Sequence, residues 1–203
     1  MKNKKFEILK SLPAYGPMYI PISEQGTPFY SEGFPVRFYK SEGDSWVANF
    51  ELGRTDFYEI FELDIPSLLI ISGGQCFIMN PDEPKPIEIF GGDYINYLKS
   101  IDGRIILYNK THLTVIDSKG SHWDSEQISL YGLGEMKISE DNIITGLFYE
   151  FASTEADDLW IPFEYNIDAK SLMYDDSLLE TVYKKYLPFY KNNKKPWWKL
   201  YYS

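Results

Sequence analysis

Apolar residues along the middle of the chain form short runs separated by turn-forming residues. Leu68–Ile71 is followed by Gly73–Gly74 and then by Cys76–Met79. Two later units repeat this order of strand, turn and strand: Arg104–Tyr108 with His112–Asp117, and Asn142–Tyr149 with Trp160–Asp168. Short apolar runs bounded by Gly, Asn and Asp are typical of β-strands. The pattern therefore predicts a mainly β fold built from antiparallel hairpins.

A further hairpin is expected before these units. Phe34–Lys40 and Ser45–Leu52 flank a polar turn, and Trp46, Ala48 and Phe50 should share one face of the second strand because strand side chains alternate. The units recur at a spacing close to that of a propeller blade. The hairpins are therefore expected to form either a propeller-like or a sandwich-like sheet assembly.

The two ends of the chain have different patterns. Residues 1–33 are rich in Pro and Gly and predict short extended pieces joined by turns, whereas residues 34–168 form the β core. Ser177–Glu180 has the form of a capping box, so we expect a helix over residues 177–187 that ends before Pro188. Residues 189–203 form an aromatic and basic tail. One domain over residues 1–203 suits this length.

Composition narrows the class of protein. The chain has 203 residues, of which 44% are hydrophobic, so a folded domain is expected. Its net charge of −10 disfavours nucleic-acid binding and suits a basic protein partner. The sequence contains no apolar run long enough to span a membrane, and we expect no secretory signal because residues 6–12 are interrupted by charges. The single cysteine, Cys76, fits a reducing compartment, and we expect a cytoplasmic protein.

The search for catalytic chemistry identifies no catalytic, cofactor-binding or metal-binding residue. Gly73–Gly74 and Gly91–Gly92 follow strands but open no phosphate-binding helix, so we interpret both pairs as turns. His112 and His122 lack the spacing of a zinc site. Cys76 lies in an apolar run, which predicts a buried and unreactive thiol. The sequence therefore favours a protein without a cofactor.

Aromatic residues next to charged ones are the candidate binding surface. We assign to it Trp123, Asp157, Asp158, Trp160, Trp197 and Trp198. Over residues 183–203, six lysines interleave with aromatic residues, a pattern that also suits single-stranded nucleic acid. We favour packing of these rings on the acidic body, because two adjacent exposed Trp side chains would be costly.

One part of the chain resembles a known group of proteins. The residues are Gly120–Ser125, Gly132–Leu133, Ile144–Gly146, Trp160–Phe163 and Asn166–Asp168. They are similar to short motifs of an uncharacterised group of bacterial single-domain proteins. Tyr131 stands where that group has an Asp before the glycine. The resemblance implies a β-rich fold, and it does not indicate any particular activity.

These observations favour a non-catalytic protein-binding module of unknown specificity, such as an immunity or accessory protein of a bacterial toxin system. Small size, acidity and the 17 tyrosines support this interpretation. The alternative is a carbohydrate-active hydrolase that uses paired carboxylates and an aromatic cleft. A Trp-lined groove with two carboxylates would favour the hydrolase, and a flat or convex acidic face would favour the binding module.

Overall fold

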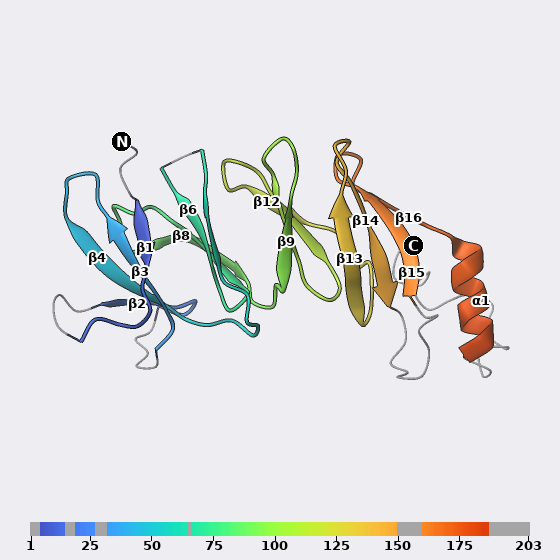
Figure 1. Ribbon diagram of the computed structural model, residues 1–203, viewed down its shortest axis with the longest axis horizontal. Coiled ribbons are helices and arrows are strands. Elements are labelled where there is room, and N and C mark those ends of the chain that lie inside the picture. Colours follow the sequence, from blue (N-terminus) through green and yellow to red (C-terminus); the bar gives the residue numbers. More distant parts are fainter. Residues whose placement is uncertain (1–4, 15–18, 27–31, 65, 150–159, 187–203) are drawn as a thin grey trace. The chain divides into compact units, whose positions relative to one another are not determined.

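The computed structural model describes residues 5–14, 19–26, 32–64, 66–149 and 160–186, with side chains described as far as residue 181. Contacts divide the chain into two compact units, residues 1–126 and 127–203, and each is described by itself. The chain is mainly β, as the apolar runs predict, and the described residues include one α-helix (Figure 1). The expectation of one domain over residues 1–203 stays a prediction.

The first unit contains three four-stranded sheets. The first sheet has the order β1-β3-β4-β2, and the other two follow the chain as meanders, β5 to β8 and β9 to β12. The strands of the first sheet are β1 (Phe6–Ile8), β2 (Ile20–Ile22), β3 (Phe34–Tyr39) and β4 (Ser45–Phe50). Those of the second are β5 (Glu59–Glu62), β6 (Leu68–Ser72), β7 (Gln75–Met79) and β8 (Pro86–Gly91). Those of the third are β9 (Asn96–Lys99), β10 (Ile105–Tyr108), β11 (Leu113–Ile116) and β12 (His122–Asp124).

The two central strands of the second sheet are buried on both faces. Every residue of β6 and β7 is buried. Leu68 and Ile70 belong to the core cluster that they share with the first sheet, whereas Leu69 and Ile71 belong to the cluster shared with the third sheet. A strand covered on both faces needs apolar side chains at every position. This explains why Leu68–Ile71 is a continuous apolar run.

The second unit contains a fourth meander and the helix. Its strands are β13 (Gly132–Ile138), β14 (Ile143–Tyr149), β15 (Trp160–Asn166) and β16 (Ser171–Tyr174), and the helix is α1 (Asp176–Tyr186). Burial alternates along β15, where Ile161, Phe163 and Tyr165 are buried and the residues between them are exposed. One face of this sheet therefore packs into the core, and the other face meets solvent.

The predicted hairpins correspond to the central strands of the sheets. The pairs β3–β4, β6–β7, β10–β11 and β14–β15 are the four apolar units of the sequence. Trp46, Ala48 and Phe50 are buried in one cluster, as strand alternation predicts. Four consecutive four-stranded sheets match the strand number of propeller blades. Among the described residues of 1–33, β1 and β2 are extended pieces, and both join the first sheet.

The helix begins one residue earlier than predicted and has a different cap. The carboxylate of Asp175 accepts hydrogen bonds from the backbone N–H of Ser177 at 2.8 Å and of Leu178 at 3.3 Å. The Ser177 hydroxyl donates to the same oxygen. The capping role predicted for Ser177 is therefore wrong. A carboxylate one residue before the first turn reaches the unpaired N–H groups better than a serine already inside the helix.

Candidate functional site

Three glycine-bearing segments of the first unit meet backbone to backbone. We call Gly53, Gly73, Gly74, Gly91 and Gly92 the glycine node. The backbone N–H of Gly53 donates to Ser72 O at 2.9 Å, and that of Thr55 donates to Gly73 O at 2.9 Å. The backbone N–H of Arg54 donates to Gly92 O at 2.8 Å. The segment after β4 is thereby fixed to the β6–β7 turn and to the end of β8.

Glycine is required at this node by both conformation and space. Gly73 and Gly74 have φ values of 59° and 82°, as a tight two-residue hairpin turn demands. A Cβ on Gly53 would lie 2.8 Å from Gly92 O and well inside van der Waals contact with Gly73 O. The interpretation of Gly73–Gly74 and Gly91–Gly92 as turns agrees with this geometry. Their further role is to allow close approach of the backbone.

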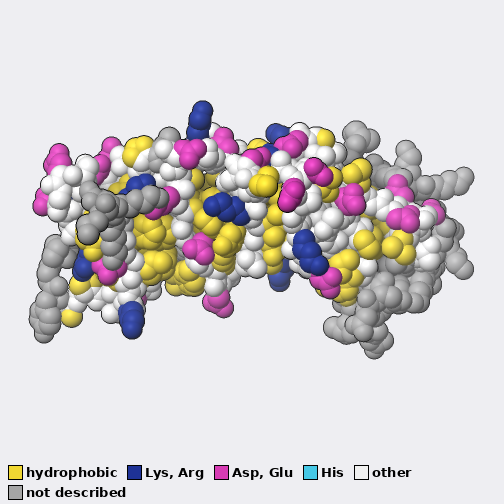
Figure 2. Space-filling model, turned by 45° about the horizontal axis from the view of Figure 1, so that its top comes forward, with side chains coloured by type: hydrophobic (Ala, Val, Ile, Leu, Met, Phe, Trp, Pro, Cys, Tyr) yellow, Lys and Arg dark blue, Asp and Glu magenta, His cyan; other side chains and the backbone are white. Residues whose placement is uncertain are grey.

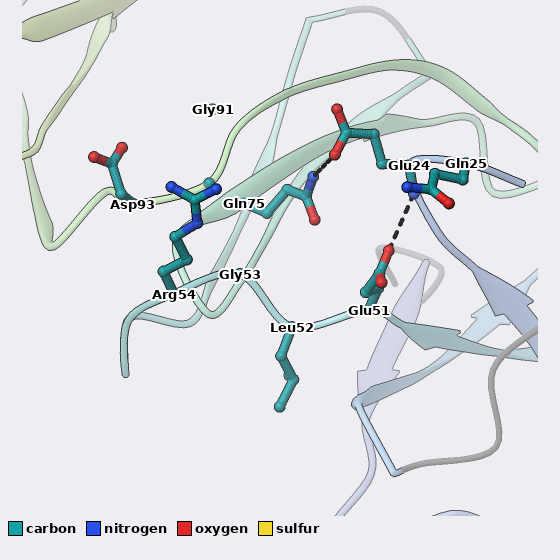
Figure 3. Close-up of a pocket in the computed structure, with 10 residues that line it drawn as sticks. Glu24, Gln25, Glu51, Leu52, Gly53, Arg54, Gln75, Gly91 and Asp93 are labelled. Atoms are coloured by element: carbon teal, nitrogen blue, oxygen red, sulfur yellow. Dashed lines mark hydrogen bonds between the residues drawn. The ribbon is translucent and has the colours of Figure 1, made fainter.

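A polar pocket of about 450 Å³ lies beside the glycine node. We call this cavity the polar pocket. It is lined by Glu24, Gln25, Glu51, Leu52, Gly53, Arg54, Gln75, Gly91, Gly92 and Asp93. In the view of Figure 3, Glu24 and Glu51 lie at one end, Arg54 and Asp93 lie at the other, and Gln75 lies between them. Three carboxylates and one guanidinium give the lining an excess of negative charge.

Hydrogen bonds order the acidic end of the polar pocket. The Glu51 carboxylate accepts the backbone N–H of Glu24 at 3.2 Å. The Gln75 side chain is only 6% exposed, and its amide N–H donates to the Glu24 carboxylate at 3.4 Å. Because Gln75 is buried and begins β7, the acceptors at this end are held by a rigid part of the fold.

The ten lining residues include no aromatic side chain. The hydrolase hypothesis requires two carboxylates and an aromatic cleft together. Here the carboxylates line a pocket of the first unit, whereas the exposed aromatic cluster described next belongs to the second unit. The hydrolase alternative stays a prediction.

An aromatic cluster lies on the solvent face of the sheet in the second unit. We call Tyr131, Tyr149 and Trp160 the aromatic patch. The ring centroids of Tyr149 and Trp160 are 5.1 Å apart, and those of Tyr131 and Tyr149 are 6.5 Å apart. Tyr131 is 48% exposed and Trp160 is 38% exposed. Large apolar area is therefore left at the surface by three adjacent rings.

Two glycines of the edge strand β13 make room for the Trp160 indole. Trp160 stands on β15, and its ring crosses β14 to reach Gly132 and Gly134 on β13. A Cβ on Gly134 would lie 3.2 Å from the indole, whereas one on Gly132 would lie 3.7 Å from it. A large ring laid over strand glycines covers backbone that has no side chain of its own. The indole thereby has room beside both glycines and is still 38% exposed.

The structure describes two of the six residues assigned to the binding surface. Trp160 belongs to the aromatic patch, as described above. Trp123 is half-buried on β12 in the first unit, opposite Val115. The other four, Asp157, Asp158, Trp197 and Trp198, lie outside the described residues, as does the aromatic tail. Trp123 and Trp160 therefore belong to different units.

The histidines and the cysteine have structural surroundings. The His122 ring stacks on Phe90 with centroids 3.9 Å apart, and the His112 ring nitrogen shares a hydrogen bond with the Thr111 hydroxyl at 2.7 Å. The described residues contain no group of three or more His, Cys, Asp and Glu that could hold a metal ion. Cys76 is buried, as its apolar neighbours predict, and burial raises the pKa of its thiol.

Sequence reasoning missed the residues that complete both sites. The polar pocket draws on four separate segments, and Glu24, Glu51 and Arg54 belong to no recognisable motif. Paired glycines after two strands were the available signal. For the aromatic patch the signal was Gly132 and Gly134 at alternate positions of one strand, which leaves two neighbouring positions on one face without side chains.

Comparisons with known proteins add little to this geometry. No protein-family model matches the chain, and no curated protein matches it. The chain is similar to the extracellular domain of a putative one-component system from B. thetaiotaomicron, with 10% identity and a TM-score of 0.40. That likeness covers 79% of this chain and 26% of the other. The resemblance to a bacterial group noted in the sequence stays a prediction.

The surface of the described residues carries charges of both signs. Figure 2 shows acidic and basic side chains scattered over the visible face, between areas of hydrophobic side chains. Among the described residues, no helix is both long and apolar enough to cross a membrane.

Proposed function

We propose that this chain is a non-catalytic binding module that recognises a protein partner through the aromatic patch. The observation that carries the proposal is the position of Trp160, whose indole lies over Gly132 and Gly134 and stays 38% exposed beside Tyr149. Trp and Tyr dominate the energetics of protein interfaces because each ring buries much area with little loss of rotamer freedom. A ring already held in place adds affinity because less freedom is lost on binding.

The acidity of the chain supports a basic partner. A net charge of −10 favours encounter with a positively charged protein and disfavours encounter with nucleic acid. The cellular role that we propose is that of an immunity or accessory protein of a bacterial toxin system. Small size, acidity and high tyrosine content support that role.

The test is affinity capture from the native cell followed by binding measurements with the purified partner. We expect Trp160→Ala to weaken the complex at least about tenfold, as for an interface hot spot. Ile101→Ala is the control, because Ile101 is a 74% exposed hydrophobic residue of the first unit. A partner that binds Trp160→Ala as tightly as the wild type would overturn the role of the patch.

The two glycines supply a matched pair of variants. Gly134→Ala places a methyl group 3.2 Å from the indole and should displace it, whereas Gly132→Ala places one at an ordinary 3.7 Å. We expect Gly134→Ala to shift the tryptophan fluorescence and to lower the affinity for the partner. Gly132→Ala should change the fluorescence and the affinity less. Equal effects of the two variants would show that the seating of the ring does not matter.

A further inference from the structure

We infer that the polar pocket binds the cationic end of a Lys or Arg side chain. The inference rests on the proposed function for the claim that this side chain belongs to a protein partner. It does not use the aromatic patch, and it assigns a second recognition site to the first unit. Three observations carry it: the charge of the lining, an open acceptor on a buried side chain, and an apolar wall.

The charge of the lining favours a cation. Glu24, Glu51 and Asp93 face the cavity with Arg54 as the single basic residue. In the view of Figure 3, Arg54 lies at the end where Asp93 lies, away from Glu24 and Glu51. The negative charge at the Glu24 and Glu51 end is therefore the less compensated. A guanidinium or ammonium group placed there would gain charge-assisted hydrogen bonds.

Gln75 supplies the second observation. Its side chain is 94% removed from solvent, and its amide N–H donates to Glu24. Among the described residues no hydrogen bond reaches its Oε1 atom, and Gln75 lines the cavity. A carbonyl oxygen that belongs to a largely buried side chain and has no donor in the protein favours a ligand that brings N–H groups. Cationic side chains have several such donors and no acceptor.

The wall of the polar pocket suits the rest of such a side chain. Leu52 lines the cavity and is 44% exposed. Lys and Arg carry an aliphatic stem that packs on apolar surface while the charged head stays in a polar environment. Gly91 and Gly92 add no side chain to that wall, so the stem has room to enter.

The test uses small probes on the full chain. N-acetyl-arginine amide carries the cation, and N-acetyl-citrulline amide has nearly the same shape without the charge. NMR titration should show saturable shifts at Gly53, Arg54 and Gly92 with the arginine probe, and binding about tenfold weaker with the citrulline probe. N-acetyl-lysine amide forms a third arm. Tighter binding of arginine than of lysine would assign the site to a guanidinium, and equal binding would assign it to cations in general.

Isosteric variants connect the binding to the named carboxylates. Glu24→Gln with Glu51→Gln keeps both hydrogen-bond acceptors but removes two charges, and it should abolish the shifts. Glu42→Gln with Glu83→Gln changes the charge equally at exposed turn residues outside the polar pocket and should leave the shifts intact. Equal shifts with arginine and citrulline, or arginine binding that survives the first pair of changes, would overturn the inference.

A fourth measurement separates this inference from the proposed function. Trp160→Ala should bind the arginine probe as the wild type does, because Trp160 is not part of the polar pocket. If that variant loses its protein partner but keeps the probe, both proposals stand. If the wild type never binds the probe, the polar pocket inference fails and the aromatic patch is unaffected.

Discussion

The hydroxyl of Tyr94 donates a hydrogen bond to the hydroxyl of Thr114, and their oxygens are 2.6 Å apart. The direction follows from the next contact, in which Thr114 donates its only hydroxyl proton to the Asp124 carboxylate at 2.6 Å. Since that proton is committed, Tyr94 must be the donor to Thr114. Tyr94 is 5% exposed and Thr114 is 2% exposed, so both hydroxyls are satisfied inside the first unit.

Thr114→Val should destabilise the chain more than the loss of one exposed hydrogen bond would. Valine has nearly the same shape but leaves the buried Tyr94 hydroxyl without an acceptor, and we expect about 1–3 kcal/mol lower free energy of unfolding. Urea unfolding measures it. Thr114→Ser, which keeps the hydroxyl, is the control and should lose less. A Thr114→Val protein as stable as the wild type would show that Tyr94 finds another partner.

The same tyrosine makes stability sensitive to alkali. Burial raises the pKa of Tyr94 well above its ordinary value near 10, with smaller opposing and supporting effects from Thr114 and nearby acids. The folded state therefore holds the proton more tightly than the unfolded state does. This contribution is fully present below about pH 10 and is lost as the pH rises and the unfolded tyrosine ionises.

We therefore expect the free energy of unfolding to fall more steeply once the pH passes about 10, and this part of the fall to be smaller in Tyr94→Phe. The fall should not vanish in this variant, because burial also raises the pKa of Tyr108 and of Cys76. Denaturant titrations of both proteins at a series of alkaline pH values make the comparison. Identical slopes would mean that Tyr94 ionises as easily in the folded state as in the unfolded state.

The central strands were predictable because their environment fixes their pattern. β6 is covered on both faces, so Leu68–Ile71 had to be apolar throughout, and its turn had to contain residues that accept positive φ. Edge strands carry weaker signals. β8 mixes exposed and half-buried residues, and β13 contains an irregularity between Gly134 and Lys137. Such strands look like loops in the sequence, because only one side of each is paired.

The candidate sites were less predictable than the fold. Trp160 was identified from the sequence, but the glycines beneath it lie two strands away, and the register across β14 sets that contact. The polar pocket depends on the approach of the segment after β4 to two separate turns. Contacts between segments distant in the sequence follow from packing, which local patterns do not encode.

Gly53→Ala should be among the most destabilising single changes in the first unit. The new Cβ would lie 2.8 Å from Gly92 O and closer still to Gly73 O, and both are backbone atoms that cannot rotate away. We expect about 3 kcal/mol or more of destabilisation by thermal or urea unfolding. Gly103→Ala is the control, since Gly103 has positive φ but open space around its Cα. A cost no larger than that of the control would mean that the glycine node can open without strain.

Cys76 should react slowly with thiol reagents while the protein is folded. The side chain is 0% exposed and belongs to the core cluster between the second and third sheets. Burial raises the pKa of its thiol, so the reactive thiolate is scarce as well as inaccessible. Ellman's reagent at mildly alkaline pH should therefore label the native protein slowly and the denatured protein at once.

The Thr114→Val variant should be labelled faster than the wild type if labelling proceeds through global unfolding, since this variant populates the unfolded state more. Fast labelling of the native wild type would show that the second sheet opens locally at β7, and would make Cys76 a candidate nucleophile.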